Sequence, residues 1–166
     1  MGDRARDGTG LTTREGAQAD APFVVRLGAA AFARFGVYGP IMQEFLASPD
    51  VVSFIAETAG ERVGFALVDL PAAYRRVADL VAIAVEPAHR RTGVGRALLS
   101  RVIAFLEERA ESSLLVLTVA EDNAHAIALF ESKGFRMIPG SDGRYAGGQT
   151  SRRMGRSVFP RTGGAR

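Results

Sequence analysis

The segment 90–95 combines the residue types that an anion-binding loop requires. Its sequence is Arg90-Arg91-Thr92-Gly93-Val94-Gly95, and Arg96 follows it. Glycines let the main chain turn its N–H groups inward and let a ligand approach closely. A helix that begins here adds free N–H donors and the positive end of its dipole, while the arginines add full charges. This pattern is typical of a phosphate site at a helix N-terminus, and the alternative is a glycine-containing turn with solvent-exposed arginines.

Two familiar phosphate-binding motifs do not fit this segment. A P-loop requires a lysine directly after its last glycine, and Lys133 is the only lysine in the chain. A dinucleotide-binding fingerprint requires a third glycine, which would fall at Leu98. That fingerprint also belongs to the first strand–helix unit of its domain, whereas several predicted strands precede this loop. The pattern therefore predicts a phosphate site of another kind.

The elements that must position this loop follow from the hydrophobic pattern. Residues 77–85 and 113–120 are largely apolar runs, which indicates strands, and residues 93–110 carry apolar side chains at steps of three and four, which indicates a helix. The complete prediction is strands over 11–14, 51–58, 62–70, 77–85, 113–120, 135–138 and 151–158, with helices over 20–35, 41–47, 93–110 and 122–133.

The order of these predicted elements is β-α-α-β-β-β-α-β-α-β-β. Three consecutive strands before the long helix imply a mixed sheet, antiparallel and then parallel, flanked by helices in an α/β (α+β) fold. A doubly wound fold would instead alternate strand and helix throughout. We predict a single domain over residues 11–158, a disordered segment over 1–10 and a basic flexible tail over 159–166.

The composition of the chain excludes several classes of protein. Apolar residues make up 47% of the 166 residues and charged residues 23%, which is close to a soluble globular average. Because cysteine is absent, disulfides and thiolate metal sites are excluded, and no metal site is predicted. No apolar run reaches the roughly 18 residues that a membrane span requires, and residues 1–20 lack the apolar core of a secretory signal. The prediction is a cytoplasmic protein without a membrane partner.

The formal net charge of +3 comes from arginines that are dispersed along the chain. The one local basic excess is near the C-terminus, at Arg152, Arg153, Arg156, Arg161 and Arg166. Because Phe159 is the only aromatic residue there, we interpret this region as solvated and predict no nucleic-acid partner. The alternative, nucleic-acid binding through the tail, predicts a DNA affinity that falls steeply with salt.

Three linked motifs resemble the GNAT superfamily of N-acetyltransferases. Arg90-x-x-Gly93-x-Gly95 resembles the family's (Gln/Arg)-x-x-Gly-x-(Gly/Ala) loop. The run 78–85 resembles its fourth strand, and the run 123–135 resembles its Asn-x-x-Ala-x-x-Leu-Tyr-x-x-x-Gly-Phe motif, most of all in the branch that acetylates protein N-termini, including those of ribosomal proteins. The resemblance covers about residues 20–158 and is specific over 79–135. It implies a GNAT-like fold and acetyl-CoA as cosubstrate.

The resemblance also implies a role for each matching stretch. Main-chain amides over 91–96 would hold the pyrophosphate of acetyl-CoA. The main chain over 83–85 would pair with the pantetheine arm like an added strand and would offer an N–H to the thioester carbonyl. Asn123 would contact the same arm, with helix capping as its alternative role. The residues implied in cofactor binding are Ile83, Ala84, Val85, Arg90, Arg91, Thr92, Gly93, Val94, Gly95, Arg96, Asn123 and Phe130.

The implied reaction is direct attack of a neutral amine on the thioester, and it needs a base because most amines are protonated at neutral pH. Asp79 lies eleven residues before Arg90, the spacing at which histone-acetylating members carry their general base. A half-buried aspartate on a strand would have a raised pKa, which suits a base, and the alternative is an aspartate that solvates its own loop. Glu86, which precedes Pro87 at the strand end, and Glu57 are further candidates.

Two positions depart from the family pattern. Phe130 stands where many members carry a tyrosine that returns a proton to the CoA thiolate, and Tyr145 or water is the predicted substitute. Thr118 stands where the branch that acetylates protein N-termini carries a glutamate base. His89 and His125 match no catalytic position of the family, and we interpret both as surface histidines.

We therefore predict an acyltransferase, an acetyl-CoA-dependent N-acetyltransferase that acts on a primary amine of a small molecule or of a protein N-terminus. The acceptor pocket would be formed by the first two helices and by the loops 71–76 and 139–148. The alternative function is a CoA-binding regulatory module with little or no turnover, which the missing tyrosine at Phe130 motivates. The identity of the acceptor and the oligomeric state stay open, a homodimer included.

Overall fold

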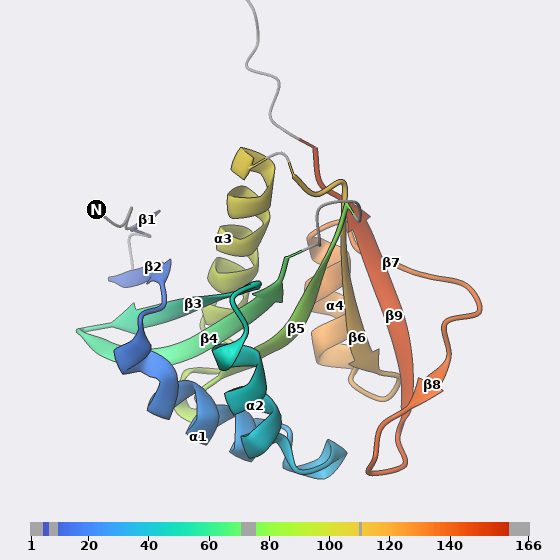
Figure 1. Cartoon of the computed structure of the whole chain (residues 1–166), viewed down its shortest axis with the longest axis horizontal. Coiled ribbons are helices and arrows are strands. Elements are labelled where there is room, and N and C mark those ends of the chain that lie inside the picture. The colour runs from blue at the N-terminus through green and yellow to red at the C-terminus, as the bar shows by residue number, and fades with distance from the viewer. Residues whose placement is uncertain (1–4, 7–9, 71–75, 110, 160–166) are drawn as a thin grey trace, which may run out of the picture.

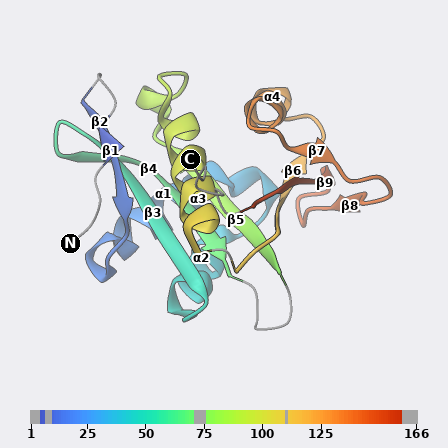
Figure 2. The same ribbon diagram turned by 90° about the horizontal axis from the view of Figure 1, so that it is seen from above.

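A mixed β-sheet forms the centre of the molecule, and helices cover both of its faces (Figure 1). The computed structural model describes residues 5–6, 10–70, 76–109 and 111–159. Helices α1 (Ala21–Ala31) and α2 (Tyr38–Ala47) pack on one face of the sheet, while α3 (Val94–Arg109) and α4 (Ala124–Ser132) pack on the other (Figures 1 and 2). Most of the predicted N-terminal segment 1–10 and of the tail 159–166 lies outside the described residues.

The predicted strand order is confirmed, and two short strands are added to it. The strands are β1 (Ala5–Arg6), β2 (Leu11–Glu15), β3 (Val51–Thr58), β4 (Glu61–Asp69), β5 (Val77–Val85), β6 (Leu114–Ala120), β7 (Arg136–Met137), β8 (Gly143–Arg144) and β9 (Thr150–Ser157). They lie in the order β1-β2-β3-β4-β5-β6-β9-β7, with β8 paired to β9. Among the strands that the structure describes, only the β5–β6 pair is parallel. The additions, β1 and β8, have two residues each, which is too short for any sequence period to reveal.

The segment between the first two helices differs from the prediction. The helix predicted over 20–35 ends at Ala31, and a 3-10 turn at Ala33–Phe35 follows it. Gly36 then takes a φ of 150°, a conformation that requires glycine. The helix predicted over 41–47 begins earlier, at Tyr38, so Gly39 and Pro40 lie in the first turn of α2. Proline is tolerated there because first-turn N–H groups have no intrahelical partner to lose.

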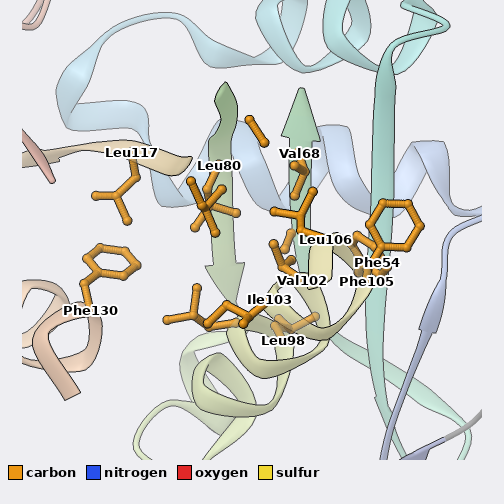
Figure 3. Packing of buried hydrophobic residues seen from close by; sticks show 14 of the residues in the cluster. Phe54, Val68, Leu80, Leu98, Val102, Ile103, Phe105, Leu106, Leu117 and Phe130 are labelled. Atoms are coloured by element: carbon orange, nitrogen blue, oxygen red, sulfur yellow. The ribbon is translucent and has the colours of Figure 1, made fainter. Parts of the chain in front are cut away.

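The larger hydrophobic core lies between α3 and the sheet (Figure 3). The predicted apolar positions of the helix are all buried, namely Val94, Leu98, Val102, Phe105 and Leu106. The helix can lie this close because Gly64 of β4 has no side chain, and a Cβ there would come within 3.1 Å of side-chain carbons of Val94 and Leu98. This packing fixes the N-terminus of α3 directly over the end of β5. Within the described residues, no helix is both long and apolar enough to span a membrane.

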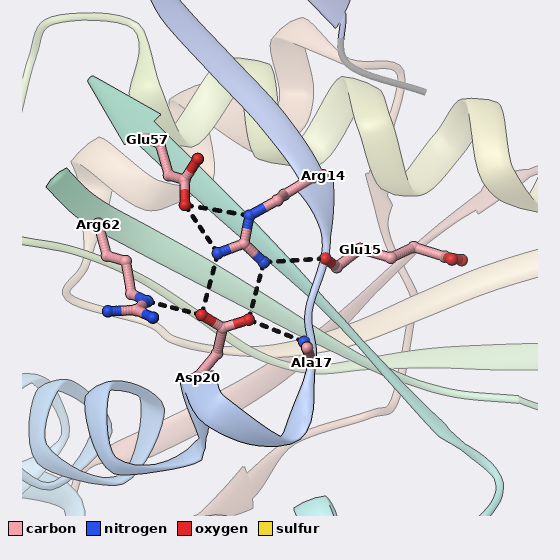
Figure 4. Close-up of polar contacts among 6 residues, drawn as sticks. All are labelled: Arg14, Glu15, Ala17, Asp20, Glu57 and Arg62. Carbon is pink, nitrogen blue, oxygen red and sulfur yellow. Dashed lines mark hydrogen bonds and ion pairs between the residues drawn. The ribbon is translucent and has the colours of Figure 1, made fainter. Parts of the chain in front are cut away.

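A network of ion pairs anchors the start of α1 to the sheet (Figure 4). The Asp20 carboxylate, which is 2% exposed, accepts hydrogen bonds from Arg14 at 2.7 and 3.0 Å and from Arg62 at 2.6 Å. Arg14 also donates to Glu57 at 2.7 Å. Asp20 is the N-cap residue of α1, but its side chain binds these arginines and the amide of Ala17 instead of a helix amide.

We expect Asp20→Asn to lower the free energy of unfolding by about 2 kcal/mol at pH 7, because it weakens charge-assisted hydrogen bonds at a buried site. The Arg14 guanidinium, chiefly, holds the pKa of Asp20 far below its ordinary value. A depressed folded-state pKa stabilises the fold above the unfolded pKa near 3.9, and the effect is lost as the pH falls below that value. Urea titrations should therefore show a smaller wild-type advantage at pH 3 than at pH 7.

The control for this substitution is Asp142→Asn, because the Asp142 side chain is 64% exposed and lies 3.7 Å from Arg152. It should change the free energy of unfolding by no more than about 0.5 kcal/mol. An Asp20→Asn protein as stable as the wild type at pH 7 would show that the network does not anchor α1.

Candidate functional site

A β-bulge in β5 lies next to the point where β5 and β6 stop pairing. In the pairing of β4 with β5, Leu67 faces Ala82 but Val68 faces Leu80, which leaves Val81 as an extra residue of β5. A bulge of this kind bends its strand and increases the local twist. Accordingly, β5 pairs with β6 only from Val77 to Leu80, and the two strands diverge beyond that point (Figure 1).

The divergence gives β5 a free edge inside the sheet. Residues 82–85 pair with β4 on one side, and on the other side residues 81–85 pair with no strand among the described residues. The corresponding part of β6, up to Ala120, pairs with β9 instead. Unpaired N–H and C=O groups of a strand are a ready template for an extended partner. This edge can therefore bind an elongated ligand that carries amide groups.

The loop after β5 has a backbone suited to an anion. Arg91 has a φ of 63° and Gly93 a φ of 90°, so left-handed residues alternate with ordinary ones just before α3 begins at Val94. Such alternation points successive N–H groups toward one point and forms an anion-binding concavity. The first-turn amides of α3 add further donors, because the first intrahelical bond runs from the amide of Ala97 to the carbonyl of Gly93. A left-handed arginine costs about 1–3 kcal/mol, and such strain is often found at functional sites.

The side chains of this loop divide into two groups. Arg91 and Arg96 are exposed, as is Arg90, whose Nε also donates to the carbonyl of Val85 at 3.3 Å. The other two residues face elsewhere: the Thr92 hydroxyl donates to the carbonyl of His89, and Val94 is 3% exposed in the core. Any contribution of Thr92 and Val94 to ligand binding is thus limited to their main-chain groups.

A cleft with two parts runs along the free edge of β5. The first part, here called the arginine groove, has a volume of about 970 Å³. The sequence-predicted residues that line it are Ile83, Ala84, Val85, Arg90, Arg91, Gly93, Gly95, Arg96, Asn123 and Phe130. The second part, here called the aromatic pocket, has a volume of about 370 Å³ and extends from Ile83 along β5 to Asp79. The two parts share Ile83, Asn123 and Phe130, so they form one continuous cleft.

Two residues of α4 stand at the junction of groove and pocket. The Asn123 carbonyl oxygen caps α4 by accepting from the amide of Ala126 at 3.2 Å, which leaves its NH₂ group able to donate to a ligand. Phe130 is 5% exposed and packs against Phe135 with ring centroids 5.8 Å apart. The junction therefore has an apolar wall and one amide donor.

Of the predicted carboxylates, the structure brings only Asp79 into the cleft. Asp79 is half-buried in the aromatic pocket and forms an ion pair with Arg153 at 3.0 Å. Burial raises the pKa of Asp79, the positive charge of Arg153 opposes that rise, and the negative charge of Asp69 adds to it. Glu86 is paired with Arg26 of α1 and does not line the cleft, while Glu57 belongs to the Asp20 network.

Tyr145, from the loop 139–148, also lines the aromatic pocket. Its ring packs on Phe35 with centroids 4.5 Å apart. Burial, reinforced by Tyr38 and opposed by Arg34, raises the pKa of Tyr145 to about 12. Its hydroxyl is therefore protonated at every pH at which the protein would act, and it can donate a hydrogen bond. Thr118 lines the same pocket.

The pocket also contains aromatic residues that the sequence interpretation did not single out. Phe32, Phe35, Tyr38 and Phe45 line it, and all four come from the end of α1, the 3-10 turn or α2. The first two helices are predicted above to form part of the acceptor pocket without these residues being named, although aromatic residues at 32, 35 and 38 next to two glycines are a signal of a pocket wall. Of the predicted acceptor loops, 139–148 supplies Tyr145, whereas most of 71–76 lies outside the described residues.

The predicted surface histidines differ in position. His125 is exposed at the edge of the arginine groove. His89 is partly buried at the start of the loop, where its carbonyl accepts the Thr92 hydroxyl. Across the part of the chain that the structure describes, no group of three His, Cys, Asp or Glu residues is arranged to hold a metal ion.

A family model and curated proteins match the sequence of this chain. The family model described as "Acetyltransferase (GNAT) family" matches residues 23–135. A [ribosomal protein bS18]-alanine N-acetyltransferase from Escherichia coli is 46% identical over 74 residues, which cover 40% of this chain and 49% of that protein. The chain thus spans about half the length of this curated relative.

Solved structures share the fold over nearly the whole chain. The ribosomal-protein-S18-alanine N-acetyltransferase from Escherichia coli superposes with a TM-score of 0.73 and 26% identity, covering 94% of this chain and 99% of that one. The spermidine N-acetyltransferase from Vibrio cholerae, in complex with CoA and spermine, gives a TM-score of 0.72 with 20% identity and covers 91% of this chain and 97% of that one. The second likeness concerns the fold alone.

Proposed function

Because the chain belongs to the GNAT acetyltransferase family, we propose that it is an N-acetyltransferase that moves the acetyl group of acetyl-CoA to a primary amine. One observation carries this proposal. The free edge of β5 leads from the anion-binding loop at one end to a half-buried carboxylate, Asp79, at the other. Such an edge suits a molecule with phosphates at one end, amides in the middle and a reactive carbonyl at the other end.

The residues of the cleft fit acetyl-CoA part by part. Main-chain amides over 91–96, together with Arg90, Arg91 and Arg96, would hold the pyrophosphate. Residues 83–85 would pair with the amides of the pantetheine arm, and the Asn123 NH₂ group would donate to the same arm. The acetyl group would then lie at the junction beside Phe130. Acetyl-CoA supplies an activated acetyl group as a thioester, and a main-chain N–H of the β5 edge would stabilise the charge that develops on the carbonyl oxygen.

Asp79 is proposed to take the proton from the incoming amine. As the amine attacks the thioester carbonyl, the N–C bond forms, the C–S bond breaks and the electron pair leaves with the sulfur. The amine proton passes to the Asp79 carboxylate, directly or through one water. Burial raises the pKa of Asp79, which makes it a better base than an exposed aspartate, and its position in the pocket places it on the acceptor side.

Tyr145 is proposed to donate a hydrogen bond to the departing sulfur, because Phe130 has no hydroxyl. Since burial raises the pKa of Tyr145 to about 12, complete proton transfer to a thiolate with a pKa of about 8.5 is unfavourable. We expect Tyr145→Phe to lower kcat about 3- to 10-fold, the value of one hydrogen bond, without changing acetyl-CoA affinity. Steady-state kinetics would measure this, and Tyr38→Phe, which removes another hydroxyl of the same pocket, should change kcat less than twofold.

A CoA-binding regulatory module is the second candidate, and Phe130 is the observation that favours it. Calorimetry with acetyl-CoA combined with thiol release over a broad amine panel separates the two functions. The enzyme predicts binding and acceptor-dependent thiol release. Binding without any acceptor-dependent release would favour the module, and an absence of binding at millimolar acetyl-CoA would contradict both. A cytoplasmic location is also proposed, supported by the ribosomal-protein acetyltransferase among the relatives.

A further inference from the structure

The aromatic pocket has a lining that suits one chemical class of amine. We propose that the acceptor is a compact apolar primary monoamine, an arylalkylamine or alkylamine, and not a polyamine, an aminoglycoside or a polypeptide N-terminus. This proposal rests on the proposed function and names the substrate class of the same site. Three features of the pocket carry it: its apolar lining, its single carboxylate and its small volume.

The walls of the pocket are mostly apolar, with aromatic rings from the end of α1, the 3-10 turn, α2, α4 and the loop of Tyr145. Phe32 and Tyr38 lie 5.3 Å apart between centroids, and Phe35 and Tyr145 lie 4.5 Å apart. Ile41 and Phe45 extend this apolar surface along α2. Transfer of a hydrocarbon group from water to such a surface is favourable in free energy. Hydroxyl groups would instead lose their hydrogen bonds to water without finding enough hydrogen-bond partners in the pocket. The lining therefore favours a hydrocarbon body over the hydroxyl-rich rings of an aminoglycoside.

In the part of its lining that the structure describes, the pocket contains one carboxylate, which can pair with one ammonium group. Asp79 is the one acidic residue among the described residues that line it, and Arg153 already pairs with it at 3.0 Å. A second ammonium group of a polyamine would lie among the rings, without a carboxylate of its own. Removing a charge from water without an opposite charge is costly. A monoamine avoids this cost, because its single nitrogen lies at Asp79.

Hydrogen bonds tie the 3-10 turn beside the pocket to neighbouring segments of the chain. Arg34 donates to both oxygens of Asp122 at 3.1 and 2.8 Å, which joins the 3-10 turn to the connection between β6 and α4. The carbonyl of Arg34 accepts from Gln149 at 2.7 Å, and the carbonyl of Phe35 accepts from the amide of Gly147 at 3.0 Å. The volume of about 370 Å³ is near the lower end for small-molecule sites. A small volume, with the 3-10 turn on one side held in place by these hydrogen bonds, favours a compact molecule over the continuing chain of a polypeptide.

A series of straight-chain primary amines from propylamine to hexylamine tests whether the pocket binds the hydrocarbon part of the acceptor. Each added methylene should raise kcat/KM about fourfold, the factor that corresponds to burying one CH₂ group, until the pocket is filled. At equal concentration, 2-phenylethylamine should be acetylated at least about tenfold faster than spermidine or a peptide with an N-terminal alanine. A flat series, or faster acetylation of spermidine or the peptide, would overturn the proposed substrate class.

Ile41→Asp places a second carboxylate in the pocket and leaves the arginine groove untouched. It should lower kcat/KM for hexylamine at least about tenfold and change acetyl-CoA affinity less than twofold. Gln43→Asp is the matched control, because Gln43 is exposed on the same helix and should behave as the wild type. If the aspartate variant does not fold, Ile41→Ala should still show the effect by shifting the preferred alkylamine to a longer chain. An unchanged preference in a folded Ile41 variant would contradict this site.

Different results would contradict the proposed function and the proposed substrate class. If acetyl-CoA does not bind, or binds without thiol release for any amine, the proposed function fails and the substrate class fails with it. If acetyl-CoA binds and thiol release requires spermidine or the peptide, only the substrate class is overturned.

Discussion

Replacing Asp79 by asparagine should lower kcat/KM for the amine about 100-fold at pH 7 and change acetyl-CoA affinity less than twofold. The reason is that a positioned base contributes about 10²–10⁴-fold when the attacking amine is mostly protonated. In the wild type the rate should fall on the acid side as Asp79 takes up a proton. Burial raises the pKa of Asp79, so this fall should begin at a higher pH than for an exposed aspartate, and the variant should lack it. Near pH 10 the difference should narrow, because free amines lose their own proton there.

Two control variants test whether the effect comes from the Asp79 carboxylate itself. One removes its ion pair with Arg153, and the other removes the alternative base Glu86. Arg153→Gln breaks the same Asp79–Arg153 pair but keeps the carboxylate, so it should retain most of the activity. Glu86→Gln removes the other predicted carboxylate, which is paired with Arg26 outside the cleft, and should retain activity within about threefold. A full rate in Asp79→Asn, or an equal loss in Glu86→Gln, would assign the base elsewhere.

Gly93→Val should weaken acetyl-CoA binding about 10- to 100-fold. Gly93 has a φ of 90°, and a β-branched residue is a severe outlier in that region. To accept valine the loop must leave its present backbone conformation, and the amides over 91–96 would then no longer converge on one anion. The strain of about 1–3 kcal/mol sets the size of the loss. Calorimetric titration with acetyl-CoA measures it directly.

Gly60→Val is the matched control for backbone strain. Gly60 has a φ of 81° in the turn between β3 and β4, and like Gly93 it has open space around its missing Cβ. Both substitutions should therefore destabilise the fold by a similar amount, but only the one at Gly93 should affect acetyl-CoA. Equal affinities in the two variants would show that the loop does not bind the cofactor.

Much of the cofactor side of the cleft was predictable from local sequence. The loop 90–95 has its two glycines and three flanking arginines next to one another in the chain, and the helix that follows has a clear apolar period. Interactions within such a short segment depend little on the rest of the fold. The residues that line the arginine groove are therefore largely the predicted ones.

The acceptor side depends on contacts between distant segments, which no local pattern encodes. The bulge at Val81 arises from the register between β4 and β5, and a strand pattern with one extra residue still looks like a strand. The pairing of Glu86 with Arg26 joins positions sixty residues apart. The aromatic pocket likewise forms only when the 3-10 turn meets the loop of Tyr145.

Amide hydrogen exchange with and without acetyl-CoA tests the central claim most directly, because it reports both binding and the place of binding. The free edge of β5 and the loop after it should be the site, so exchange should slow at residues 83–85 and 91–96 when acetyl-CoA is added. Strands away from the cleft, such as β2 and β3, should not change. Unchanged exchange at these amides with saturating acetyl-CoA, or protection confined to another part of the chain, would contradict the account.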